Sequence, residues 1–181
     1  MSSPRSHRHP AWFRWVFLPL LRLPALLLSS VLGPYVWRGS RNVPRSGGLL
    51  VIANHPSDAD PVLTQQACPR PLHFMAESGL WSRKWLAPIL DLFRAFPVNR
   101  GEADRAAIRH AIQLLKAGEA VCLYPEGKVS PDGTLQPLKP GLALLVRHAD
   151  VPVIALRIRG SERIVPYPST IPRPAFRLVQ A

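Results

Sequence analysis

The sequence has 181 residues, enough for one domain with a short additional segment. Its hydrophobic fraction of 47% is ordinary for a globular protein and argues against a disordered chain. Lysine and arginine number 23 against 11 acidic residues, and this net charge of +12 favours a polyanionic partner: a nucleic acid, an anionic membrane or a phosphorylated substrate. Cys68 and Cys122 lack metal-ligand spacing, and the apolar run around Cys122 indicates a buried thiol in a reducing compartment.

The amino-terminal region contains arginines, no acidic residue and a long apolar run over residues 11–32, AWFRWVFLPLLRLPALLLSSVL. As one helix this run would be about 33 Å long, enough to span a bilayer. Arg14 and Arg22 argue against spanning, since each costs roughly 2.5–3.5 kcal/mol near the bilayer centre. Pro19 and Pro24 would also kink or break the helix.

A helix lying on the membrane surface fits this run better. Arg14 and Arg22 fall about 80° apart around a helix and can face lipid phosphates, while the aromatic residues enter the apolar layer. A signal peptide fits poorly, because no small-residue cleavage site clearly follows; the alternative is a helix packed on the protein's own core. The residues predicted to contact the membrane are Trp12, Phe13, Arg14, Trp15, Phe17 and Arg22.

Short apolar runs alternate with helical patterns along the rest of the chain. Strands are predicted over residues 48–53, 72–76, 95–98, 120–124 and 151–158, and helices over 62–67, 82–92, 103–116 and 142–147. The pattern predicts an α/β fold: a mixed, largely parallel sheet flanked by helices, with an N-terminal membrane-associated helical segment. We place that segment in residues 1–40 and the second domain in 41–181. In such sheets the chemistry usually lies on loops at the carboxyl ends of strands.

The loop NHPSDADP follows the first predicted strand and contains His55 and Asp60. A carboxylate beside an imidazole fixes its tautomer and stabilises the imidazolium, which makes a general base for a hydroxyl group. Asp60 before Pro61 is also a suitable N-cap for the next helix, and the two roles are compatible. Alone, this spacing is common by chance.

A second polar loop, YPEGKVS, follows the strand predicted at 120–124. Glu126, the backbone freedom of Gly127 and the charge of Lys128 suit a polar headgroup. An ordinary exposed turn explains the same residues when they are taken alone. We expect the two loops to meet in one cleft.

Four segments in this order resemble the motifs of the glycerophosphate and lysophosphatidate acyltransferases. NHPSDADP is similar to the first motif, Asn-His-x4-Asp, and FPVNRGEADR to the second, whose arginine binds glycerol phosphate. LYPEGKVS resembles the third motif, Pro-Glu-Gly-x-x-Ser, and VPVIALRIRG the fourth. Two positions depart from the pattern: Val129 stands where the third motif usually has arginine, and Asn99 where the second often has aspartate.

The resemblance implies that His55 deprotonates the acceptor hydroxyl and that Asp60 orients the imidazole. The donor would be a thioester, acyl-CoA or acyl-carrier protein, the acceptor a lysophospholipid such as 1-acyl-glycerol-3-phosphate, and backbone N–H groups near Gly127 would hold the oxyanion. Neither Cys122 nor Ser57 has a nucleophile's setting, and no metal or other cofactor is implied. The residues expected to bind the acceptor are Asn54, Arg100, Glu126, Gly127, Lys128 and Ser130.

Three other readings remain. A nucleic-acid-binding protein would explain the charge, but the arginines flank an apolar, Trp-rich segment and no nucleic-acid-binding motif is present. A catalytically idle membrane-binding protein would not need His55 and Asp60. An acyltransferase for another lysolipid keeps the chemistry and changes the acceptor. We expect a membrane-associated enzyme at the cytoplasmic face of the inner or plasma membrane.

Overall fold

The computed structural model describes residues 35–99, 104–169, 171–174 and 179–181. The predicted membrane-surface segment up to residue 34 lies outside these residues, and so does Arg100. Among the helices of the described ranges, none has the length and apolar character needed to cross a membrane.

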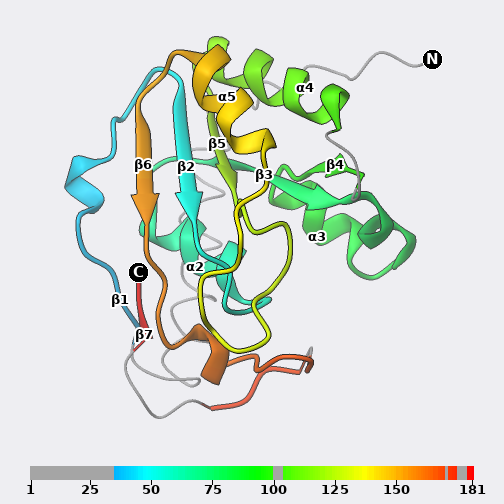
Figure 1. Ribbon diagram of the computed structural model, residues 1–181. Coiled ribbons are helices and arrows are strands. Elements are labelled where there is room, and N and C mark those ends of the chain that lie inside the picture. The colour runs from blue at the N-terminus through cyan, green and yellow to red at the C-terminus, as the bar shows by residue number, and fades with distance from the viewer. Residues whose placement is uncertain (1–34, 100–103, 170, 175–178) are drawn as a thin grey trace.

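A five-stranded parallel sheet forms the centre of the domain, with strand order β4-β3-β5-β2-β6 (Figure 1). Its strands are β2 (Leu49–Ala53), β3 (Leu72–Glu77), β4 (Phe96–Val98), β5 (Ala120–Leu123) and β6 (Val153–Leu156). The α/β sheet is confirmed, but every pair within it is parallel, and the antiparallel part of the predicted mixed sheet is reduced to one isolated bridge between Arg159 and Gln180 in the described residues.

Helices cover both faces of this sheet, as Figure 1 shows with α5 in front and α2 behind. They are α2 (Asp60–Ala67), α3 (Ala87–Leu92), α4 (Arg105–Lys116) and α5 (Gly141–Ala149), with 3₁₀ turns η2 (Ser40–Asn42), η3 (Ser78–Ser82) and η4 (Ser161–Arg163). On one face Leu50 and Val121 pack with the apolar sides of α4 and α5. On the other, Val51 and Cys122 pack with residues around the end of α2. The alternation of side chains along a strand thus supplies two apolar layers.

All four predicted helices begin at a different residue in the structure, and for α3 and α4 the difference has a local cause. The predicted helix at 82–92 is α3 alone, preceded by η3, because Pro88 lacks an N–H and fits only the first turn of a helix. The predicted helix at 103–116 begins at Arg105, and the side chain of Asp104 accepts hydrogen bonds from the N–H groups of Ala106 and Ala107. This cap satisfies two of the donors that a helix start leaves open.

The segment before β2 is held to the end of the chain. Strand β1 (Tyr35–Val36) pairs in parallel with β7 (Val179–Gln180), and the Tyr35 hydroxyl donates to the Leu63 carbonyl at 2.8 Å. Tyr35 and Val36 fall in the segment that we assigned to residues 1–40, yet they pack with the folded body. Sequence patterns miss this pairing because it joins residues that are far apart along the chain.

Candidate active site

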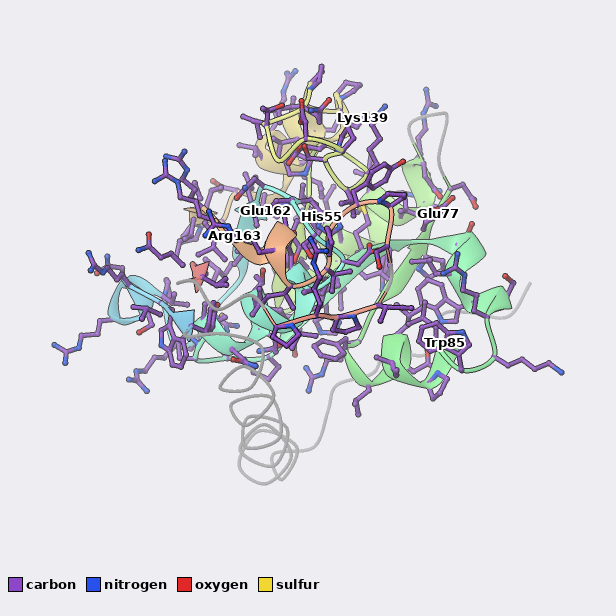
Figure 2. The ribbon with its side chains drawn as sticks, turned by 90° about the horizontal axis from the view of Figure 1, so that it is seen from below. His55, Glu77, Trp85, Lys139, Glu162 and Arg163 are labelled. Atoms are coloured by element: carbon purple, nitrogen blue, oxygen red, sulfur yellow. The ribbon has the colours of Figure 1, made fainter. Side chains whose placement is uncertain are left out.

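The two polar loops meet at the carboxyl edge of the sheet. β2 and β5 are parallel neighbours, with Ile52 opposite Leu123, so the loops that follow them start side by side. The backbone N–H of His55 donates to Oε1 of Glu126 at 2.8 Å, which confirms that the two loops meet. Figure 2 looks onto this edge and shows His55 near its middle.

His55 and Asp60 form a hydrogen-bonded pair. Nδ1 of His55 lies 2.9 Å from Oδ2 of Asp60, and the imidazole is 15% exposed whereas the carboxylate is fully buried. An ionised carboxylate only accepts hydrogen bonds, so Nδ1 carries the proton and Nε2 has the free lone pair. Because Nδ1 is bonded to Asp60 and the ring is partly exposed, Nε2 is the atom that can take a proton from a substrate hydroxyl.

The backbone around Asp60 holds the carboxylate in place. The N–H of Ser57 donates to Oδ2 at 2.8 Å. Burial raises the pKa of the Asp60 carboxyl, and the hydrogen bonds from His55 and from the Ser57 N–H act against that rise. Asp60 is the first helical residue of α2 and makes no capping hydrogen bond; Ala59 is the N-cap, so the N-cap role expected for Asp60 is wrong. Its carboxylate serves the His55 loop instead.

The Tyr124 ring lies against one face of the His55 imidazole. The two rings stack with centroids 4.0 Å apart and an interplanar angle of 18°. The Tyr124 hydroxyl is 3.1 Å from Oγ1 of Thr64, a fully buried residue of α2. Burial raises the pKa of Tyr124, so the ring stays neutral. Tyr124 therefore restricts the plane of the base, a role that the sequence motif does not reveal.

Three residues expected to bind the acceptor hold the loops together in this structure. Glu126 is 2% exposed, and its second oxygen accepts from the Gln136 N–H at 2.8 Å. The Asn54 side chain exchanges two hydrogen bonds with the backbone of Ile158, at 2.9 and 2.7 Å. Ser130 donates its N–H to the His55 carbonyl at 2.7 Å and its hydroxyl to the Thr134 carbonyl at the same distance.

Gly127 and Lys128 lie exposed on the turn after β5. The φ of +74° at Gly127 suits glycine, and a Cβ there would meet Cε of Lys139 at 3.3 Å. The N–H of Gly127 is bonded to the Tyr124 carbonyl at 3.0 Å, so the oxyanion donors expected near Gly127 stay a prediction for its neighbours. Asn99, which stands where the second motif of the family often has aspartate, makes a local contact: its Oδ1 accepts a hydrogen bond from the Ser78 hydroxyl at 2.8 Å.

The site offers no activated nucleophile of its own among the described residues. Cys122 is fully buried, and burial raises the pKa of its thiol. The Ser57 hydroxyl is also fully buried and donates to the Val165 carbonyl at 3.0 Å. Direct attack by an acceptor hydroxyl activated at His55 is the chemistry that this geometry permits.

Sequence reasoning missed the residues that act through backbone contacts and ring stacking. Tyr124 was part of a recognised motif, and its place next to a strand end was the available signal. Gln136 contributes only its backbone N–H, for which a sequence carries no signal. Ser161 follows the fourth motif immediately, and it lies fully buried beside the site.

Comparison with known proteins supports the motif assignment. A family model described as Acyltransferase matches residues 35–159. The chain is 29% identical over 120 residues to "1-acyl-sn-glycerol-3-phosphate acyltransferase" of Bacillus subtilis, covering 66% of this chain and 59% of the relative. It is 30% identical over 152 residues to "Probable 1-acyl-sn-glycerol-3-phosphate acyltransferase" of Mycoplasma pneumoniae, covering 80% and 56%. The chain thus spans little more than half the length of these relatives.

A solved structure shares the fold. The crystal structure of the 1-acyl-sn-glycerophosphate acyltransferase PlsC from Thermotoga maritima superposes with a TM-score of 0.77 at 23% identity. The match covers 96% of this chain and 70% of that one. The family match includes both loops of the His55 site, so the chain belongs to the acyltransferase family.

Proposed function

We propose that this chain transfers a fatty acyl group from an acyl thioester to the free hydroxyl of 1-acyl-glycerol-3-phosphate. The observation that carries the proposal is the pair formed by partly exposed His55 and buried Asp60, on a loop hydrogen-bonded to Glu126. The names of the relatives from Bacillus and Mycoplasma support this acceptor. Another lysolipid with a free hydroxyl is the alternative acceptor.

The proposed reaction needs one proton carrier. Nε2 of His55 takes the proton of the acceptor hydroxyl, and the oxygen of that hydroxyl attacks the thioester carbonyl. The carbon–sulfur bond breaks as the tetrahedral intermediate collapses, and the imidazolium returns the proton to the leaving thiolate. Asp60 stabilises the imidazolium between these steps. The products are a diacyl glycerol phosphate and a free thiol, so no acyl-enzyme, metal or cofactor is part of the proposal.

Two cations are expected to bind the acceptor phosphate. Arg100 is two residues after β4 in the sequence, and Lys128 is exposed on the turn after β5. Lys128 supplies a point charge where the family pattern places an arginine at position 129, without the two-pronged geometry of a guanidinium. We therefore expect weaker selection for the phosphate than an arginine would provide.

Because the proposed acceptor is a membrane lipid, we expect the reaction to take place at a membrane surface. Trp85, in the turn before α3, is 65% exposed, and Ile89 in the first turn of α3 is 43% exposed. Arg83 and Lys84, next to Trp85 in the sequence, are exposed cations. Exposed aromatic and basic residues of this kind suit a headgroup layer. Together with the arginine- and tryptophan-rich residues 1–34, they support the proposal of a peripheral enzyme at the cytoplasmic face.

The test is an assay of the purified full chain with 1-oleoyl-glycerol-3-phosphate in mixed vesicles. Parallel reactions contain oleoyl-CoA or oleoyl-acyl-carrier protein, and the diacyl product is measured. Product with either donor supports the proposal and identifies that donor. Lyso-phosphatidylcholine and lyso-phosphatidylethanolamine serve as competing acceptors. If one of these is acylated and 1-oleoyl-glycerol-3-phosphate is not, the alternative acceptor class replaces the proposed one; if none is acylated, the enzymatic function is wrong.

The membrane part is tested with a chain that starts at residue 35, so that β1 is retained. Flotation with vesicles containing phosphatidylglycerol should recover the full chain and much less of the shortened one. Activity on long-chain acceptors should fall more than activity on short-chain soluble analogues. Equal flotation of the two proteins would contradict a membrane-binding role for residues 1–34.

A further inference from the structure

Two buried oxygen atoms beside the catalytic pair have unused hydrogen-bonding capacity. Oδ1 of Asp60 and Oγ of Ser161 are inaccessible to solvent, and neither makes a hydrogen bond of normal geometry within the described part of the chain. Both residues are fully buried. Buried polar atoms without a partner are rare because their desolvation is not compensated. Within the same part of the chain, Oδ1 of Asp60 is an acceptor that lacks a donor, and the Ser161 hydroxyl is a donor that lacks an acceptor.

The fold brings these atoms close together. Ser161 opens η4 directly after Gly160, whose φ of +88° is a backbone conformation that favours glycine. The Ser161 hydroxyl interacts with the Asp60 carboxylate and lowers its pKa, against the larger effect of burial. Figure 2 shows η4, with its labelled Glu162 and Arg163, beside His55.

The η4 segment is anchored to the loop that carries the base. Oγ of Ser57 donates to the Val165 carbonyl at 3.0 Å, and the same serine accepts from the N–H of Ala59 at 3.2 Å. Ile164 and Val165 pack with Leu63 of α2. Because α2 starts with Asp60, these contacts set the position of Ser161 relative to the carboxylate.

We propose that the Ser161 hydroxyl donates a hydrogen bond to Oδ1 of Asp60, which makes Ser161 a positioning residue for the base His55. This rests on the proposed function, in which His55 and Asp60 activate the acceptor hydroxyl. Oδ2 already holds the imidazole and the Ser57 N–H. A donor on Oδ1 fixes the rotation of the carboxylate and spreads its charge over both oxygens.

The other titratable groups near Asp60 do not change their charge with pH in the working range, so none of them takes over the role of Ser161 as a donor. Besides His55, those that act on its charge are Tyr35, Cys122 and Tyr124. Burial is the main cause that raises the pKa of each of these three groups, so they stay neutral over the working range. The Tyr35 and Tyr124 hydroxyls are bonded to residues of α2 instead.

The test compares Ser161→Ala with Ile164→Val. The first removes the hydroxyl from a buried site; the second removes one methyl group from the same segment and leaves the proposed bond intact. For Ser161→Ala we expect kcat to fall about 10-fold or more, as for the loss of a hydrogen bond to a charged group. KM for both substrates should stay near wild type. The acidic limb of the kcat profile should move to higher pH, because Asp60 without the donor is a stronger base.

Ile164→Val should keep the wild-type kcat and pH profile, even if its thermal midpoint falls as far as that of Ser161→Ala. A second measurement is independent of turnover: the NMR signal of the proton between His55 and Asp60 should change its chemical shift in Ser161→Ala and keep it in Ile164→Val. A Ser161→Ala protein with wild-type kcat, pH profile and proton signal overturns this inference and leaves the proposed function standing. If the wild-type chain transfers no acyl group while the proton signal responds as expected, the proposed function fails and the hydrogen bond stands.

Discussion

Glu126 holds two segments together through hydrogen bonds to one carboxylate. Its replacement by glutamine distinguishes this structural role from the headgroup-binding role that the family resemblance implies. One oxygen accepts from the N–H of His55 and the other from the N–H of Gln136, both at 2.8 Å. Glutamine keeps one acceptor oxygen and places an NH₂ group against the second N–H. The side chain is 2% exposed, so water cannot repair the mismatch. Glu126→Gln therefore loses one charge-assisted hydrogen bond and leaves a buried donor without a partner.

We expect a loss of about 2–3 kcal/mol in the free energy of unfolding, the value typical of a hydrogen bond to a charged group. For a chain of this size that corresponds to a thermal midpoint lower by roughly 4–12 °C. The backbone N–H of the base is one of the two donors, so we also expect kcat to fall about 10²-fold, as for a misplaced catalytic group. Urea unfolding, calorimetry and steady-state kinetics measure the three quantities.

The matched control is Glu162→Gln, which changes the same atoms on η4. Its side chain is 38% exposed and lies 3.8 Å from Nε of Arg163, a surface pair worth about 0–1 kcal/mol. If Glu126→Gln unfolds like the wild type and only KM for the acceptor rises, Glu126 binds the headgroup, as the family resemblance implies, and its loop-tying role is refuted.

Three further predictions concern the base, the α4 cap and acid stability. His55→Ala should lower kcat by about 10²–10⁴-fold, measured below its unfolding midpoint, and turnover close to wild type would exclude the proposed mechanism. The midpoint itself should also fall, since the variant loses the stack on Tyr124 and leaves the buried Asp60 carboxylate without the imidazole. Asp104→Ala should cost about 1 kcal/mol in urea unfolding because two N–H groups at the start of α4 lose their cap, and an unchanged midpoint would contradict the capping geometry. His73, whose Nε2 lies 3.6 Å from Oε2 of Glu119, is the main cause that lowers the pKa of Glu119. The ionised Glu119 therefore stabilises the fold fully above the unfolded-state pKa, and this stabilisation disappears as pH falls through the folded-state pKa. The unfolding midpoints of wild type and Glu119→Gln should therefore differ at neutral pH and converge in acid; a constant difference would exclude this linkage.

Much of the site's position followed from the sequence alone. Apolar runs at 48–53 and 120–124 predicted β2 and β5, and the polar loops after them were expected to meet. This expectation was sound because parallel strands end at the same edge of a sheet. The His55–Asp60 contact was also predictable, since both residues lie on one short loop and a nearby pair needs no knowledge of the rest of the fold.

Only the tertiary structure showed which polar side chains of the predicted site hold the backbone in place. Asn54, Glu126 and Ser130 have the composition of a binding site. Yet the side chains of Asn54 and Glu126 bond to backbone far along the chain, and the Ser130 hydroxyl bonds within its own loop to the Thr134 carbonyl. Tyr124 lies under His55, and Ser161 lies beside Asp60, because β2 is flanked by β5 on one side and β6 on the other. Strand order depends on long-range packing of apolar faces, which the local pattern of residues does not encode.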